Sequence, residues 1–127
     1  MRFGNSYGWI FLLVLGIVLI INLLKPAPGE AGISFDRNPS RLSFTRHARC
    51  RMDCRQINEK EIRYILSHGT VNSSKTDLSD KPCPSFAVEG YSPEDRQHLR
   101  VVFGQCASET RVITCIDLDQ DHACHCD

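Results

Sequence analysis

Hydrophobic and polar positions divide the chain into a long apolar segment near the N-terminus and a region of mixed pattern after it. Residues 9–24 read WIFLLVLGIVLIINLL and carry no charge. Together with residues 7 and 8 they would form a helix of about 27 Å, close to the ~30 Å hydrocarbon core of a bilayer. We therefore predict an N-terminal tail over residues 1–8 and a single transmembrane helix over residues 9–24. A cleaved secretory signal is the alternative, because Arg2 supplies a short positive region before the apolar run.

The next stretch, residues 25–40, is rich in proline, glycine and small or polar residues and shows no periodicity. It is predicted to be a flexible linker, which leaves residues 41–127 as one folded domain. Basic residues follow the apolar segment at Lys25, Arg37 and Arg41, against Arg2 and the α-amine before it. This difference favours a single-pass membrane protein whose domain faces the cytoplasm.

Two short helices are predicted at the start of the domain. The first covers residues 45–55, where Ala48 and Met52 make a narrow apolar stripe. The second begins at Asn58, a favourable N-cap, and Glu61 lies three residues later to complete a capping box. Gly69 is expected to end this helix in the left-handed conformation.

Period-two alternation then predicts short strands, at residues 86–91, 97–103 and 111–117, with a further short strand over residues 71–74. The connections are short, which favours an antiparallel meander. The predicted fold is therefore α+β, with two N-terminal helices packed on an antiparallel sheet of three to four strands.

Charge is balanced over the whole chain, with 15 basic and 15 acidic residues. A neutral total argues against non-specific nucleic-acid binding by the molecule as a whole. The first helix of the domain is nevertheless strongly basic, which leaves RNA or a protein as partners for this local patch. His47, Arg51 and Arg55 are four residues apart and share one face of it.

The pattern His47-Ala48-x-x-Arg51-Met52-x-x-Arg55-x-Ile57, followed by a helix, Gly69 and a meander, resembles a family of bacterial domains of unknown function, number 4258. The resemblance covers residues 42–117. It implies similarity in fold to the RelE, ParE and BrnT toxins, which include metal-independent ribonucleases. The pairs Cys83-Pro84 and Glu89-Gly90, with Ile116-Asp117-Leu118, are similar to a membrane-anchored or secreted, cysteine-bearing branch.

Metal-independent RNA cleavage needs a base for the 2′-hydroxyl and cations for the scissile phosphate. His47 is the candidate base, and His98 is the candidate for the second proton transfer. Phosphate would be held by Arg51, Arg55 and Arg100. No cofactor is required by this hypothesis.

Seven cysteines in a chain of 127 residues form a second group of interest. An odd number cannot pair completely within one molecule, so we do not expect a closed disulfide framework. Reduced thiols or a zinc site are the alternatives. Candidate zinc ligands are Cys50, Cys54, Cys83, Cys106, Cys124, Cys126 and His122, although their spacing matches no established zinc motif.

Three functions remain open at this point. The first is an interaction module on a toxin-like scaffold, tethered to a membrane, whose basic helix face binds a protein partner. The second is a ribonuclease of the RelE or BrnT type. The third is a structural or redox module based on zinc or thiols.

Overall fold

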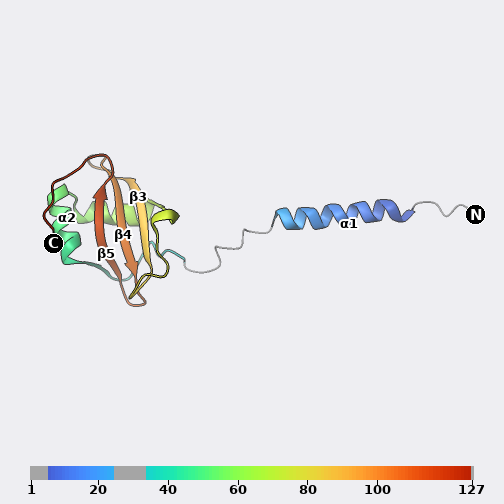
Figure 1. The fold of residues 1–127 in the computed structure, drawn as a ribbon, viewed down its shortest axis with the longest axis horizontal. Helices are drawn as coiled ribbons and strands as arrows, with labels where there is room; N and C mark the ends of the chain where they lie inside the picture. Colours follow the sequence, from blue (N-terminus) through green and yellow to red (C-terminus); the bar gives the residue numbers. More distant parts are fainter. Residues whose placement is uncertain (1–5, 25–33, 127) are drawn as a thin grey trace, which may run out of the picture. The chain divides into compact units, whose positions relative to one another are not determined.

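The computed structural model describes residues 6–24 and 34–126, which belong to two compact units, Met1–Ile33 and Ser34–Asp127 (Figure 1). The first unit contains α1 (Ser6–Leu23), an uncharged helix whose large apolar side chains are exposed. Among the described residues, no helix is long and apolar enough to cross a membrane. The transmembrane helix predicted at residues 9–24 is therefore not supported.

The second unit is an α+β domain built on a five-stranded sheet with strand order β1-β5-β4-β3-β2. Its strands are β1 (Leu42–Phe44), β2 (Thr70–Val71), β3 (Ser85–Tyr91), β4 (His98–Gln105) and β5 (Thr110–Asp117). Strand β1 runs parallel to β5, and the other pairs are antiparallel. The sheet is thus mixed and larger than the predicted antiparallel sheet of three to four strands. The missed strand, β1, has three residues and is too short to show a period of two.

Local sequence explains where the helices begin. Helix α2 (Arg46–Arg55) starts after Thr45, whose hydroxyl oxygen accepts a hydrogen bond from the Ala48 amide at 3.0 Å. Helix α3 (Glu59–His68) starts after Asn58, and the predicted capping box with Glu61 is confirmed by hydrogen bonds of 3.0 and 2.9 Å. Each cap satisfies amides that the first helical turn leaves without a partner.

Both helices end where predicted, α2 at Arg55 and α3 before Gly69, but the conformations of the residues that follow them differ from the prediction. The left-handed residue is Gln56, which follows α2 with φ of 56°. Gly69 follows α3 with φ of −69°, so the expected left-handed conformation is wrong. Gly69 is required for space instead, because a Cβ there would lie 2.6 Å from both the Ile65 carbonyl oxygen and the Val88 Cγ1 atom. Of the strand predicted over residues 71–74, only Val71 lies in a strand, β2. The last two residues of that stretch belong to a short 3₁₀ helix, η1 (Ser73–Lys75).

Both helices pack on one face of the sheet, α2 against β5 and α3 against β3 and β4 (Figure 1). The predicted alternation in β4 is confirmed, since its inward side chains are fully buried and the intervening ones are partly exposed. The core is formed by Ala48, Met52, Ile57, Ile62, Ile65, Leu66, Phe86, Val88, Leu99, Val101, Phe103, Val112 and Cys115.

The domain begins earlier than residue 41. The Phe35 ring lies 5.1 Å from the Phe86 ring, between centroids. The Asp36 amide donates to the Gln105 side-chain oxygen at 2.9 Å. Residues 34–40, predicted as part of the linker, therefore belong to the folded unit, and residues 25–33 lie outside the described chain.

Candidate functional site

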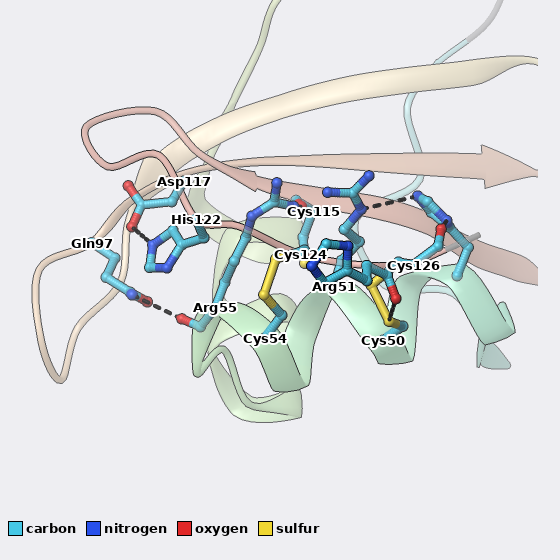
Figure 2. The surroundings of a disulfide bond; sticks show 12 residues. Cys50, Arg51, Cys54, Arg55, Gln97, Cys115, Asp117, His122, Cys124 and Cys126 are labelled. Atoms are coloured by element: carbon cyan, nitrogen blue, oxygen red, sulfur yellow. Dashed lines mark hydrogen bonds and ion pairs between the residues drawn. A yellow bond between two sulfur atoms is a disulfide. The ribbon is translucent and has the colours of Figure 1, made fainter.

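The C-terminal tail, residues 118–126, is fastened along α2 by two disulfides (Figure 2). Cys50 is bonded to Cys126 and Cys54 to Cys124, with Cα–Cα distances of 5.7 and 5.8 Å. Four residues of helix rise about 6 Å, and two residues of extended chain span about 6.6 Å. The two cysteine spacings therefore match, and the tail runs antiparallel to the helix.

A third disulfide joins Cys83, before β3, to Cys106, after β4, with a Cα–Cα distance of 5.1 Å. The expectation of reduced thiols is therefore wrong for six of the seven cysteines. The odd number of cysteines excluded only complete pairing, and one cysteine, Cys115 on β5, remains as a thiol.

Cys115 lies in the core beneath α2 and is fully buried. Burial raises the pKa of its thiol to about 11, although Arg55 and Arg51 oppose the effect. Nucleophilic attack requires the thiolate, which such a pKa suppresses at neutral pH. The remaining cysteine is thus a core residue and not a reactive centre.

His47 is held between the tail and its own helix. Its Nδ1 atom lies 3.0 Å from the Cys126 carbonyl oxygen, and its Nε2 atom lies 3.4 Å from Arg51 Nε. A carbonyl oxygen only accepts and a guanidinium only donates, so both bonds require the neutral tautomer with hydrogen on Nδ1. The candidate base is therefore engaged at both nitrogens.

Arg55 points into the domain and not to solvent, with only 9% of the residue exposed. Its Nη1 donates to the Cys115 carbonyl oxygen, and its own carbonyl accepts from Gln97 Nε2 at 3.1 Å (Figure 2). Its Nε atom is buried without a hydrogen-bond partner among the described residues. Arg55 is therefore a buried cation of the core, inaccessible to a phosphate outside.

His98 and Arg100 lie on the other face of the sheet from the helices, as their partial exposure between buried neighbours shows. The His98 ring stacks on Tyr91 with centroids 4.4 Å apart. Arg100 Nε contacts a Glu89 carboxylate oxygen at 2.7 Å, which neutralises the charge that would hold phosphate. The five residues proposed for RNA cleavage are thus not brought together in one site.

The proposed zinc ligands do not form a metal centre in the described part of the chain. All six candidate cysteines are in disulfides, and a disulfide offers no thiolate to a metal. The described residues contain no group of three or more cysteine, histidine or carboxylate side chains placed for a metal ion. Zinc binding stays a prediction for the reduced protein.

The last candidate ligand, His122, contacts Asp117 instead, at 3.1 Å between Nε2 and Oδ2 (Figure 2). Burial alone would raise the pKa of the Asp117 carboxyl, but hydrogen bonds from His122 and from the Asp119 and Gln120 amides outweigh it and lower the pKa. This pair of a buried carboxylate and a partly exposed histidine lies at the turn from β5 into the tail, and it was not predicted from the sequence.

A cavity of ≈ 330 Å³ lies where the tail meets the start of α2, and it is lined by Arg46, His47, Cys50, His125 and Cys126. Among the described residues, the arginines of α2 are unequally compensated. Arg49 pairs with Glu59 at 3.3 Å, whereas Arg46 and Arg51 form no ion pair. Within the described residues, this end of the domain therefore has positive charge without an ion-pair partner beside the cavity.

The fold is that of an α+β domain with a helix and tail joined covalently over one edge of the sheet. Residues 44–117, more than half of the chain, match the family model described as Domain of unknown function (DUF4258). The chain belongs to this family. No curated protein and no solved structure matches it.

Proposed function

We propose that the domain is an interaction module that binds an acidic segment of a protein partner, in an oxidising compartment. Binding would use the basic surface formed by Arg46, His47, Arg51 and His125. The observation that carries this proposal is the absence of ion pairs at Arg46 and Arg51 within the described chain, beside an ≈ 330 Å³ cavity. Guanidinium groups without a carboxylate partner are well suited to take one from another molecule.

A protein partner is favoured over RNA by the distribution of the charges. The chain has no net charge, so long-range attraction of a polyanion is weak. Two residues proposed for RNA cleavage, His98 and Arg100, are on the opposite face of the sheet from α2. Likewise, Arg55 is buried and His47 is engaged at both nitrogens. These contacts favour binding over catalysis at this surface.

The compartment follows from the disulfides. Three bonds using six of seven cysteines are typical of proteins outside the cytoplasm, because cytoplasmic thiols are kept reduced. This proposal replaces the cytoplasmic orientation predicted from the basic residues. It accords with the alternative interpretation of the apolar N-terminal segment as a secretory signal.

The compartment is tested by counting thiols in protein taken directly from the producing cell. The protein is acid-quenched, denatured and labelled with a maleimide, with and without prior reduction. We expect one label, on Cys115, without reduction and seven after it. Seven labels without reduction would contradict the proposed compartment.

Binding is tested with the full chain, purified without reductant in a mild non-ionic detergent. The probe is a fluorescent hexaglutamate peptide, and hexaglutamine is the uncharged control. We expect the wild type to bind only hexaglutamate, with affinity that falls as salt rises. The double variant R46E/R51E should lose binding, whereas R63E/K60E, with the same charge change on α3, should retain it. Equal binding by both double variants would contradict the proposed surface.

A further inference from the structure

We infer that the cavity at the start of α2 is the seat of one carboxylate of the acidic partner, held by Arg46 and His125. The inference rests on the proposed function and makes it more specific. It distinguishes a single anchoring pocket from a diffuse basic surface.

The lining of this cavity differs from that of the other two described cavities. Its polar side chains are those of Arg46, His47 and His125, and the lining contributed by the described residues includes no carboxylate. The cavity between α3 and β3, of ≈ 260 Å³, includes Glu89, and the cavity near the third disulfide, of ≈ 140 Å³, includes Asp80. Among the described residues, this cavity is therefore the one of the three that offers an anion a guanidinium and histidine donors without a carboxylate in its lining.

One lining group that could repel an anion is already satisfied. The Cys126 carbonyl oxygen, which belongs to a residue of the lining, accepts the hydrogen bond from His47 Nδ1. His47 is in turn positioned by Arg51. His47 is thus a positioning residue. It holds the tail in place, and its hydrogen bond occupies the Cys126 carbonyl oxygen, which would otherwise repel an anion.

The donors left for a ligand are Arg46 and His125. Both are exposed, and neither side chain makes a hydrogen bond or ion pair among the described residues. A guanidinium can hold a carboxylate through two parallel hydrogen bonds. Arg46 is also the first residue of α2, where the helix dipole adds a smaller attraction for negative charge.

The cavity depends on the disulfides because its two walls come from segments far apart in the sequence. Arg46, His47 and Cys50 belong to α2, and His125 and Cys126 belong to the tail. The Cys50–Cys126 bond, across 76 residues, is itself part of the lining. Reduction should therefore dismantle the pocket while leaving the arginines of α2 in place.

The test compares neutral single variants by hexaglutamate affinity, using the full chain in the detergent described above. We expect R46Q to weaken binding roughly tenfold, as for the loss of one hydrogen bond between charged groups. H125Q should weaken it less, and R63Q, with the same charge change on α3, should not change it. Reduction of the wild type should weaken binding at least as much as R46Q. One reactive thiol in each unreduced, denatured variant establishes that its disulfides are intact.

The outcomes separate this inference from the proposed function. Unchanged affinity in R46Q and H125Q, with weaker binding in R51Q, would overturn the pocket and leave the basic surface standing. Failure of the wild type to bind hexaglutamate would overturn both. Tighter binding of a single-stranded hexanucleotide RNA than of hexaglutamate, lost in R46Q, would also overturn the carboxylate assignment in favour of phosphate.

Discussion

The imidazole Nδ1 of His47 lies 3.0 Å from the carbonyl oxygen of Cys126, a residue 79 positions further along the chain. This contact brings the start of α2 and the end of the described chain together at one point. The candidate base therefore also joins α2 to the tail that covers it, and its role in catalysis stays a prediction.

The two disulfides of α2 should contribute to stability as a unit. Their loops of 76 and 70 residues are nested, so either bond alone removes most of the unfolded chain's freedom. We expect C54S/C124S to lower the free energy of unfolding by about 2 kcal/mol, because with the Cys50–Cys126 bond closed the second bond closes a ring of only about six residues. Removal of all four cysteines should lower it by about 6 kcal/mol, since the large loop is then opened as well. Urea denaturation measures both values.

The third disulfide provides the comparison for this experiment. It closes a separate loop of 23 residues, and C83S/C106S should therefore cost about 3 kcal/mol by itself. A large and equal loss from each single pair on α2 would show that the two bonds act independently, contrary to the nested loops.

Gly69→Ala should destabilise the domain by about 1–3 kcal/mol, as expected when a packed core is overfilled. The added Cβ would lie 2.6 Å from a backbone oxygen of α3 and 2.9 Å from the Glu89 carbonyl oxygen, neither of which can move freely. Gly104→Ala is the matched control, because its nearest neighbour is the flexible tip of Ile113 at 3.1 Å. Thermal unfolding should show the larger fall in Tm for the Gly69 variant.

Asp117→Asn should destabilise the domain at neutral pH and matter less in acid. Hydrogen bonds from His122 and two amides outweigh the effect of burial and lower the pKa of Asp117 below its ordinary value of 3.8. The ionised carboxylate therefore contributes stability above pH 3.8, and the contribution is lost as the pH falls through the folded pKa. Urea midpoints of the two proteins, measured from pH 7 downwards, should converge. A constant difference would contradict the assignment.

Glu61→Gln should change the pH dependence of stability in the opposite sense to Asp117→Asn, as measured by the same urea midpoints. Burial raises the pKa of Glu61 above its ordinary value of 4.5. The wild type is therefore most favoured below pH 4.5, and part of its stability is lost as the pH rises through the folded pKa. Glutamine keeps an oxygen for the Asn58 amide and removes this dependence. Glu61→Ala, which loses the cap, should instead cost about 1 kcal/mol at every pH.

The features that were predicted correctly are those fixed by neighbouring residues. The capping box of Asn58 and Glu61 spans three positions, and the buried alternation of β4 is visible within one strand. Strand β1 was missed because its pairing partner, Thr110–Val112, is about 68 residues away and a three-residue segment has no pattern of its own. Gly69 was correctly predicted to follow α3, but its conformation was misjudged because glycine suits both a left-handed backbone and a crowded position.

The site was harder to predict because helical spacing shows which side chains share a face of the helix but not which part of the protein that face contacts. His47, Arg51 and Arg55 do follow one another along α2, yet Arg55 meets β5 while His47 meets the tail. Two cysteines four apart in a helix and two cysteines two apart in a tail have matching lengths. This match in spacing could have indicated the two disulfides. It was not used because the odd number of cysteines was taken as evidence against a disulfide framework.

The topology also determines at which point during synthesis of the chain the domain can finish folding. Strand β1 cannot pair until β5 has been made. Likewise, Cys50 and Cys54 cannot form their disulfides until Cys126 and Cys124 are present. Every covalent and edge contact of the N-terminal part of the domain is thus made with its last residues. A chain emerging from its N-terminus into an oxidising space exposes two neighbouring thiols on α2 long before their correct partners arrive. In the oxidising compartment proposed above, any premature pairing of Cys50 and Cys54 with each other, or with Cys83, would have to be reversed before the tail could close.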